Sequence, residues 1–383
     1  MRSTRPDHRS RRLALSLVVL AALAAAACGN SGDKSSGSDK TTTTAASSGS
    51  AATITGVPGV TDKEIRFSSF GTITGNPLGN CVLECYDQGL KAYFAYRNSL
   101  GGVDGRNMVL TTELDDAIDN PDVQAIFLAT PHSLHVEQVA AVARAGKAVW
   151  CEKPLALTRA EAARSVEACH KAGVPLGAGN NKRCFASMRE LKALVDGGSL
   201  GEIMHVEGHF SNDHSTRVAG GWRDDPRESP GYGMTGAGLH ILDAFVNLAG
   251  PIRRVDAKAF APKAPPDPRD VVAVLTEFAS GATGLMATIR ATVPFWRIHV
   301  FGTKGFAEAR DEDVVRVGYI GKPPEERTYE HVDSLKVLVE SFADAVEGKA
   351  PFLVRPDQML DLIGAFEAVV KSLETGKPEV AAS

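Results

Sequence analysis

Two basic side chains in this sequence stand where they could move a proton. Lys153 directly precedes Pro154 at the end of a predicted strand, so its backbone has little freedom and its side chain is held outside the sheet. His240 lies in an apolar, helix-like stretch, with Asp243 three residues later on the same face. A neutral imidazole beside a carboxylate is a competent general base near pH 7. These residues predict acid–base chemistry.

Simpler interpretations of the same residues stay open. Taken alone, Lys153 fits a surface lysine that caps a strand. His240 equally fits a core histidine satisfied by Asp243.

The elements around Lys153 predict a doubly wound parallel sheet. Continuous apolar strands at 123–131, 147–154 and 174–180 alternate with helices at 133–146 and 158–172. Ligands of such sheets bind beyond the carboxyl ends of the strands. The polar groups expected at that edge are Thr130, Pro131 and His132, then Glu152, Lys153 and Pro154, then Asn180 to Arg183.

The pattern changes near residue 185. A helix at 185–197 is followed by longer alternating strands at 202–211, 255–262, 271–280, 282–291 and 297–303. This predicts an α+β domain with an open, mostly antiparallel sheet and helices. Before the parallel sheet, residues 56–116 predict one βαβ unit, with a helix from Cys81 to Ser99 and its second strand at 106–116.

The N-terminus predicts export. Five arginines precede an apolar run at 13–27, which is typical of a signal peptide covering residues 1–28. Small residues lead into Cys28, as in the lipobox of bacterial lipoproteins, so this resemblance implies that Cys28 is lipidated. A plain signal peptide with an incidental cysteine is the alternative. Residues 29–55 are rich in Ser and Thr and predict a disordered tether.

Composition favours a small-molecule partner. The 383 residues include 43% hydrophobic and 23% charged residues, which is typical of a soluble globular protein with two domains. A net charge of -4 gives no push toward nucleic acid, so no nucleic-acid partner is expected.

Two further patterns are not interpreted as ligand sites. His205, Glu207 and His209 share one strand face, but a packed or wetted sheet face explains them equally well, and no metal site is predicted. Gly231, Gly233 and Gly236 have the spacing GxGxxG without a preceding apolar strand, so they do not predict a dinucleotide loop.

Residues 117–383 resemble the glucose-fructose oxidoreductase, inositol dehydrogenase and MocA (Gfo/Idh/MocA) family. ATPHSLH and CEKPLALT match its motifs closely, GNNKRCF resembles its GHNRRF segment with two substitutions, and His240 matches its catalytic histidine. The resemblance implies an NAD(P)-binding Rossmann-type domain at 117–184 and a substrate and oligomerisation domain at 185–383. It assigns Lys153, His240 and Asp243 to catalysis. It assigns to cofactor binding Ala129, Thr130, Pro131, His132, His135, Glu152, Lys153, Pro154, Asn181, Arg183, Trp222 and Arg223.

The same resemblance implies the reaction. His240 would remove the proton of a secondary alcohol, Lys153 would hydrogen-bond the developing alkoxide, and hydride would pass to NAD or NADP. The expected substrate is a sugar, an inositol or a related polyol, and the expected assembly is a homo-oligomer.

The chain departs from the family pattern at two places. No GxGxxG turn precedes residue 117, so the Rossmann-type sheet is expected to be incomplete or substituted. The loop at 71–79 has the wrong spacing for a phosphate cradle, while Asp115 and Asp116 at a predicted strand end could take the place of the ribose-binding acid. Many family members have an aspartate where this chain has Gly236, so either Asp243 orients His240, or Lys153 and His240 work without a third residue.

Residues 56–116 instead resemble the opening of type I solute-binding proteins of branched-chain amino-acid ABC transporters. The matching segments are GVTDKEIRF and KAYFAYRNSLGGVDGR. This leaves two alternatives open, an exported solute-binding lipoprotein and a non-functional chimera from fusion or misassembly. As encoded, the chain is expected to be an exported, membrane-anchored lipoprotein; it is expected to be cytoplasmic if the N-terminal segment is an artefact.

Overall fold

The computed structural model describes residues 63–68, 83–102, 105, 107–111, 114–121, 123–213, 215–218, 225–261 and 267–382. The predicted signal peptide with Cys28, the tether, the loop at 71–79, and Trp222 and Arg223 lie outside these residues. Their assignments stay predictions.

The first described elements form the predicted βαβ unit. Strand β1 (Glu64–Ser68) pairs in parallel with β2 (Asn107–Thr111), and helix α2 (Leu83–Ser99) connects them. The Asn98 side chain ties the end of this helix to β2, because it donates to the Met108 carbonyl at 2.8 Å and accepts from the Met108 N–H at 2.7 Å.

The predicted strand at 106–116 is too long. It ends at Thr111, and Asp115 and Asp116 lie in the first turn of helix α3 (Leu114–Asp119). Acidic side chains are favourable there, because the first turn exposes unpaired N–H groups at the positive end of the helix dipole. The two aspartates are therefore not at a strand end, where a ribose-binding acid was expected.

A three-stranded parallel sheet confirms the predicted Rossmann-like core. Its order is β3–β4–β5, with strands Ala125–Leu128, Ala148–Cys151 and Leu176–Ala178. Between them run the short helix η1 (His132–Leu134) with α4 (His135–Arg144), and then α5 (Arg159–Ala172). A capping box of Thr158 and Glu161 begins α5, and Gly173 ends it in the left-handed conformation.

A C-terminal helix, α9 (Ser334–Val346), packs against one face of this sheet. Its Phe342 ring meets the Phe127 and Trp150 rings edge to face, with centroids 5.7 and 5.5 Å apart. Gly177 permits this approach, because a Cβ there would lie 2.7 Å from the Phe342 ring. The sequence pattern did not predict this helix.

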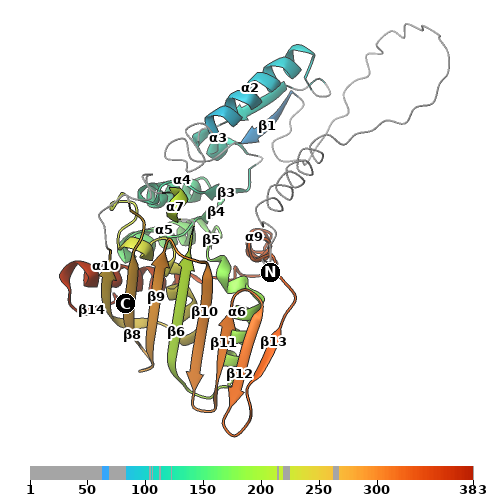
Figure 1. Ribbon diagram of the computed structural model, residues 1–383. Helices are drawn as coiled ribbons and strands as arrows, with labels where there is room; N and C mark the ends of the chain where they lie inside the picture. The colour runs from blue at the N-terminus through green and yellow to red at the C-terminus, as the bar shows by residue number, and fades with distance from the viewer. Residues whose placement is uncertain are drawn as a thin grey trace, which may run out of the picture. The chain divides into compact units, whose positions relative to one another are not determined.

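The second domain contains a nine-stranded sheet (Figure 1). Its neighbours are antiparallel except for the parallel pair β6–β9, which confirms the open, mostly antiparallel sheet. In sheet order the strands are β13 (Glu325–Thr328), β12 (Val314–Tyr319), β11 (Gly305–Arg310), β10 (Phe295–Gly302), β6 (Ile203–Asn212), β9 (Thr283–Arg290), β8 (Val271–Phe278), β7 (Ile252–Phe260) and β14 (Glu379–Val380).

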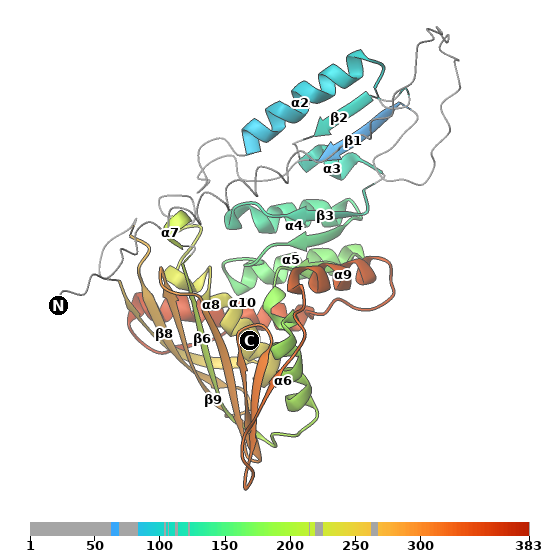
Figure 2. The ribbon, with the colours of Figure 1, turned by 45° about the vertical axis from the view of Figure 1, so that its right-hand side comes forward.

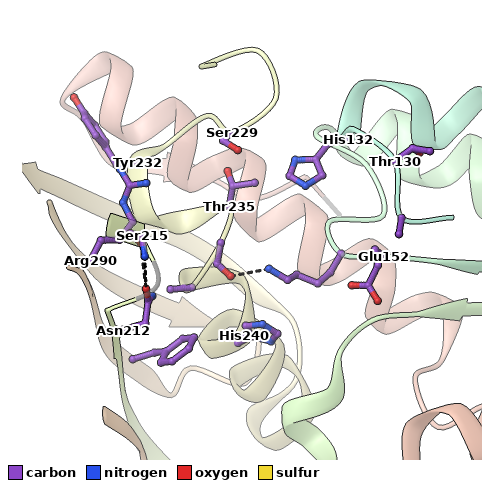
Figure 3. Close-up of a pocket in the computed structure, with 15 residues that line it drawn as sticks. Thr130, His132, Glu152, Asn212, Ser215, Ser229, Tyr232, Thr235, His240 and Arg290 are labelled. Carbon is purple, nitrogen blue, oxygen red and sulfur yellow. Dashed lines mark hydrogen bonds between the residues drawn. The ribbon is translucent and has the colours of Figure 1, made fainter. Parts of the chain in front are cut away.

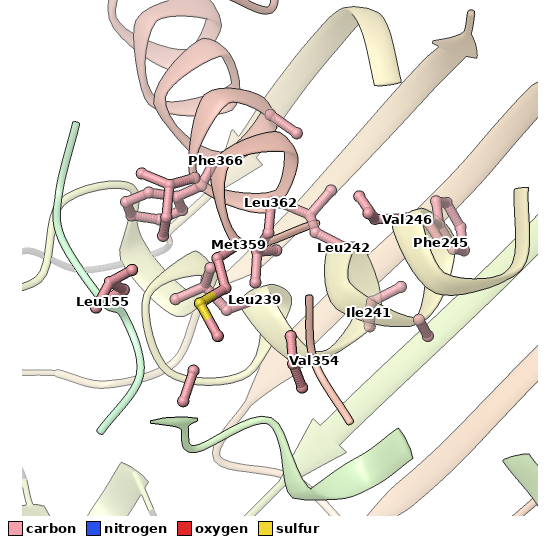
Figure 4. Close-up of a cluster of buried hydrophobic side chains, with 14 of the residues drawn as sticks. Leu155, Leu239, Ile241, Leu242, Phe245, Val246, Val354, Met359, Leu362 and Phe366 are labelled. Carbon is pink, nitrogen blue, oxygen red and sulfur yellow. The ribbon is translucent and has the colours of Figure 1, made fainter. Parts of the chain in front are cut away.

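Three helices lie on one side of this sheet: α6 (Ala186–Asp196), α8 (Gly238–Ala249) and α10 (Pro356–Thr375) (Figure 2). Helix α8 is almost wholly apolar and nearly all of it is buried, because it is enclosed between β6 and α10. Leu239 and Leu242 of α8 pack with Met359, Leu362 and Phe366 of α10 (Figure 4). Burial of such side chains contributes about 1.5–3 kcal/mol each.

Gly208 on β6 sets how closely α8 approaches the sheet. A Cβ at this position would overlap the Ile241 side chain and lie 2.9 Å from the Phe245 ring. Gly208→Ala should therefore lower the free energy of unfolding by about 1–3 kcal/mol, as overpacking in cores does. Gly89→Ala is the control for the added methyl group, because a Cβ there meets no atom within 4 Å; at this exposed position in helix α2 alanine should raise the free energy of unfolding slightly rather than lower it. Chemical denaturation with intrinsic tryptophan fluorescence measures both. An unchanged midpoint for Gly208→Ala would contradict the packing.

Candidate active site

A cavity of about 340 Å³ lies where the two domains meet, beyond the carboxyl ends of β3 and β4 (Figure 3). Residues from the Rossmann-like domain form one wall, and residues from β6, β9, α8 and the turn before α8 form the other. The cavity is lined by Ala129, Thr130, His132, Glu152, Lys153, Phe210, Asn212, Ser215, Ser229, Tyr232, Thr235, Gly236, Ala237, His240 and Arg290.

Five of the residues expected at a cofactor line this cavity: Ala129, Thr130, His132, Glu152 and Lys153. Glu152 is held in place, since its carboxylate accepts from the Trp150 indole N–H at 3.3 Å. Gly179 leaves room for that carboxylate, because a Cβ at this position would lie 2.8 Å from its carbon.

His135 has a different role from the one expected. Its side chain is fully buried, so it offers no surface to a cofactor. Its Nδ1 lies 2.8 Å from the Pro154 carbonyl and its Nε2 lies 3.1 Å from the Thr130 carbonyl. Burial lowers the pKa of this imidazole, although both carbonyls favour the charged form. His135 therefore joins the loops that follow β3 and β4.

Lys153 reaches across the cavity to the turn before α8. Its Nζ donates to the Gly236 carbonyl at 2.8 Å, the contact dashed in Figure 3. The peptide bond between Lys153 and Pro154 is cis. A Cβ on Gly236 would meet nothing within 4 Å, so the site has room for the aspartate that many family members carry there. In this chain a backbone carbonyl takes that position beside the ammonium group.

His240 faces the cavity from α8, and its side chain is 9% exposed. Burial lowers its pKa well below the usual value, and the positive charges of Lys153 and Lys182 lower it further. Its Nδ1 is buried and has no hydrogen-bond partner among the described residues. The ring packs edge to face on Phe210, with centroids 5.9 Å apart. The imidazole is therefore neutral at neutral pH.

The expected pairing of Asp243 with His240 is wrong. The Asp243 carboxylate instead accepts from Arg183, with Nε–Oδ2 at 2.8 Å and Nη2–Oδ1 at 2.7 Å, and both side chains are 2% exposed. A planar guanidinium satisfies both carboxylate oxygens at once, which an imidazole cannot do.

Arg183 also donates to Gln358 of α10 at 2.7 Å. It is therefore a structural link and does not line the cavity, contrary to its expected cofactor role. Asn181 likewise donates to Ser334 of α9 at 3.0 Å and is not among the lining residues.

Most residues of the second wall were not singled out from the sequence. Asn212 ends β6, and its Oδ1 accepts from the N–H and hydroxyl of Ser215 at 3.3 and 3.1 Å. Arg290 ends β9 and donates from Nε to the buried Asp270 at 2.8 Å. Both residues follow predicted strands, but only the parallel pairing of β6 with β9 brings the two strand ends together.

The turn at 231–236 has an unusual backbone. Gly231 and Tyr232 both have positive φ, at 75° and 57°. Tyrosine rarely adopts this conformation, and such strain is concentrated at functional sites. Tyr232 is one of the residues that line the cavity, so this strained turn borders the site.

The glycines at 231, 233 and 236 therefore belong to the turn that leads into α8. They are not a dinucleotide loop.

Glu228 links this turn to the Rossmann-like domain. Its carboxylate accepts from the Ser133 N–H at 2.9 Å and from the Ser133 hydroxyl at 2.5 Å. Its backbone carbonyl lies against His132 Nδ1. These contacts hold the two walls together at the rim of the cavity.

Acid should destabilise the protein through His240. Its pKa is lowered in the folded state, so the unfolded chain, with a histidine pKa of about 6.5, binds the proton more tightly. Stability is therefore full above about pH 6.5 and falls below it, by at most about 1.4 kcal/mol per pH unit for this group.

His240→Gln should reduce this loss, while the exposed His331 makes His331→Gln a suitable control. Urea titrations between pH 7 and pH 5 measure the slope. An equal slope in all three proteins would argue against a neutral, buried His240.

Among the described residues, no group of His, Cys, Asp and Glu is arranged to hold a metal ion. His205 contacts Thr283 at 2.7 Å, and Glu207 pairs with Arg297 at 3.2 Å. The described helices include none with the length and hydropathy needed to cross a membrane.

A parallel-sheet domain and an open-sheet domain that share one cavity define a two-domain protein of the dehydrogenase type. Two family models agree with this. The model described as "Oxidoreductase family, NAD-binding Rossmann fold" matches residues 91–180, and that described as "GFO/IDH/MocA C-terminal domain" matches residues 188–308. The chain thus carries the Rossmann and C-terminal domains of the Gfo/Idh/MocA oxidoreductase family. The first match begins in α2, upstream of the boundary predicted at residue 117.

Curated relatives share about a third of the aligned residues. Myo-inositol 2-dehydrogenase of Thermotoga maritima is 29% identical over 279 residues, which is 68% of this chain and 80% of that protein. The rhizopine catabolism protein MocA of Rhizobium meliloti is 29% identical and covers 62% of this chain and 71% of that protein. An uncharacterised oxidoreductase of Schizosaccharomyces pombe is 33% identical, but this chain spans only 41% of its length.

Solved structures share the fold. Levoglucosan dehydrogenase in complex with NADH has a TM-score of 0.66 at 21% identity, covering 77% of this chain and 88% of that chain. Aldose-aldose oxidoreductase from Caulobacter crescentus has a TM-score of 0.64 at 25% identity, covering 83% of this chain and 91% of that chain.

Proposed function

We propose that this protein is an NAD(P)-dependent oxidoreductase that oxidises a secondary alcohol of a sugar, an inositol or a related polyol. One observation carries the proposal: Lys153 and His240, from different domains, face the same cavity. The first is a hydrogen-bond donor and the second a buried neutral base. A substrate hydroxyl between them meets both functions that alcohol oxidation requires.

The Rossmann-side wall fits the nicotinamide end of a dinucleotide. Ala129, Thr130, His132 and Glu152 surround the carboxyl ends of β3 and β4, where such sheets bind their ligands. Glu152, positioned by Trp150 and Gly179, is an acceptor suited to a ribose hydroxyl. When bound, the nicotinamide ring supplies the hydride acceptor.

The catalytic work of the chain is proton transfer and orientation. His240 accepts the hydroxyl proton, which its lowered pKa permits because the ring is neutral at working pH. Lys153 donates to the same oxygen and stabilises the negative charge that develops on it. The hydrogen on the carbon that bears the hydroxyl group would leave as hydride to the nicotinamide, and the alcohol would become a ketone.

The opposite wall fits a polyol. Its lining residues carry hydroxyl, amide and guanidinium groups, and they are Asn212, Ser215, Tyr232, Thr235 and Arg290. A cavity of about 340 Å³ lies at the small end of the usual range for ligand sites, which suits one sugar-sized molecule. The names of the Thermotoga myo-inositol 2-dehydrogenase and of levoglucosan dehydrogenase support this substrate class.

Fluorescence titration with NADH and NADPH, followed by a panel of inositols, aldoses and alditols with NAD and NADP, tests the proposal. Lys153→Met and His240→Asn should each lower kcat by about 10²–10⁴-fold while cofactor binding persists, because each removes one proton-handling group. His331→Gln is the control, since His331 is exposed. Absence of binding for both cofactors, or full activity in both variants, would overturn the proposal.

Export and assembly are proposed on other grounds. We infer lipidation at Cys28 and a membrane-anchored location from the sequence of residues 1–28 and from the likeness of residues 56–116 to exported solute-binding proteins.

A homo-oligomer is supported by exposed Leu275 and Leu285 on adjacent strands β8 and β9. Palmitate labelling of the wild type but not of Cys28→Ala, and light scattering of the protein without residues 1–28, test these points. Equal palmitate labelling of the wild type and Cys28→Ala would contradict lipidation at Cys28. A monomeric mass in light scattering would contradict the homo-oligomer.

A further inference from the structure

Arg290 is the cation on the polyol side of the cavity, and an aspartate holds it from outside the cavity. Its Nε and Nη2 both donate to Oδ2 of Asp270, the residue before β8, with the Nε contact at 2.8 Å. The Asp270 side chain is 2% exposed, whereas that of Arg290 is 18% exposed. Arg290 lines the cavity and Asp270 does not. The pair is therefore buried on the aspartate side and open on the arginine side.

The turn before α8 packs on this ion pair. A Cβ on Gly233 would lie 3.1 Å from Arg290 Cγ and 3.1 Å from Asp270 Oδ1, so the bare backbone of the turn covers both side chains. The backbone N–H of Arg290 also donates to the Asp270 carbonyl at 3.0 Å. The position of Arg290 is thus set before a ligand binds, and a preorganised group binds without the cost of ordering a long side chain.

The other buried arginine–aspartate pair near the cavity is closed on both sides. Arg183 belongs to the short helix η2 (Asn181–Cys184), which follows β5. It pairs with Asp243, both side chains are 2% exposed, and Arg183 does not line the cavity. Such a pair serves structure alone. The exposed part of Arg290 distinguishes it from Arg183 and indicates a ligand.

The side chains that line the cavity beside Arg290 are neutral. Among the described lining residues Glu152 is the only one with a carboxylate, and it belongs to the Rossmann-like wall. Figure 3 shows Arg290 and Glu152 on opposite sides of the cavity, with Asn212, Ser215 and Tyr232 on the side of Arg290. This side therefore combines one guanidinium with amide and hydroxyl groups.

A carboxylate is the group that this combination recognises best. A guanidinium presents parallel N–H groups that match the two oxygens of a carboxylate, which a hydroxyl group cannot equal. A phosphate ester carries about 1.5 to 2 negative charges near pH 7. Arg290 is a weaker match for that charge, because Asp270 already balances part of its own.

We propose that Arg290 determines specificity by binding a carboxylate of the substrate, so that the polyol is a polyhydroxy acid of the aldonate or uronate type. This inference rests on the proposed function and names its substrate class. The carboxylate stays unchanged in the reaction. A secondary hydroxyl elsewhere in the molecule loses its proton to His240, the hydrogen on its carbon leaves as hydride to NAD or NADP, and a keto acid forms.

The test replaces both members of the pair together. Asp270 Oδ1 is buried and has no hydrogen-bond partner among the described residues, so loss of Arg290 alone would leave a buried charge unpaired. Arg290→Gln with Asp270→Asn removes both charges and keeps polar groups at both positions. Arg254→Gln with Glu277→Gln is the matched control, because that pair joins neighbouring strands of the same sheet and does not line the cavity. Circular dichroism and urea midpoints establish that both double variants fold.

Isothermal titration calorimetry, without cofactor and with NADH, measures the preference for a carboxylate. The matched pairs are D-glucose and D-glucuronate, D-galactose and D-galacturonate, and D-glucitol and D-gluconate. In at least one pair the wild type and the control should bind the acid about 10–100-fold more tightly than its neutral partner, as hydrogen bonds to charged groups do. The Arg290→Gln/Asp270→Asn variant should lose this preference.

Four results would overturn the proposal. They are equal affinities within every pair, no binding of any acid, a preference that survives in the Arg290→Gln/Asp270→Asn variant, and tighter binding of D-glucose 6-phosphate than of D-glucuronate. The comparisons among ligands are made in the wild type, so they decide the matter even if the variant does not fold.

Enzyme kinetics separates this inference from the proposed function. With NAD or NADP, the ratio of kcat/KM for an acid to that for its neutral partner should exceed about 10 in the wild type and fall about 10–100-fold in the Arg290→Gln/Asp270→Asn variant. A purely structural role for Arg290 would lower both rates and leave the ratio unchanged, against the proposal. If the wild type binds the acids through Arg290 but oxidises none of the compounds, the proposed function fails and the carboxylate site stands.

Discussion

The buried ion pair between Arg183 and Asp243 is the contact on which the site depends. It joins η2, which ends the Rossmann-like domain, to α8, which carries His240, and Arg183 extends the link to Gln358 of α10. A buried charge without its partner costs several kcal/mol, so neither side chain can leave the other. The pair therefore fixes the last loop of the parallel sheet against the helix that carries His240. It also removes from the cavity a carboxylate that would have raised the pKa of His240.

The electrostatics of the site follow from this arrangement. Asp243 is paired with Arg183. Burial and the positive charges of Lys153 and Lys182 all lower the pKa of His240 and so favour the neutral imidazole. In many family members, by the resemblance described above, an aspartate stands where this chain has Gly236. Here Lys153 meets the Gly236 carbonyl, a dipole in place of a full charge. The site therefore combines a buried histidine whose pKa is lowered with a lysine whose ammonium group reaches across the cavity.

The two walls of the cavity come from different sheets, and separate contacts hold them together. The Arg183–Asp243 pair acts at the buried end and Glu228 acts at the rim. Gly208 and Gly177 allow close packing of α8 and α9 because neither presents a side chain. These glycines thus set how far α8 and α9 lie from the sheets. A sequence motif gives only the position of a residue along the chain.

By itself, the sequence determined the order and type of most elements from β1 to β10, since apolar periodicity and turn residues act locally, but it did not predict the elements after β10, helices α9 and α10 among them. It also determined that Lys153 follows a strand and that His240 lies on an apolar helix, and the cavity unites these two residues. Tertiary structure decided the partners. Asp243 pairs with Arg183, and His135 links two loops. Asp115 and Asp116 lie in a helix and not at a strand end. The meeting of the strand ends at Asn212 and Arg290 depends on packing between residues far apart in the chain. The same is true of the aromatic rings around Lys182. Local sequence carries no record of such contacts, because burial and charge pairing are properties of the assembled core.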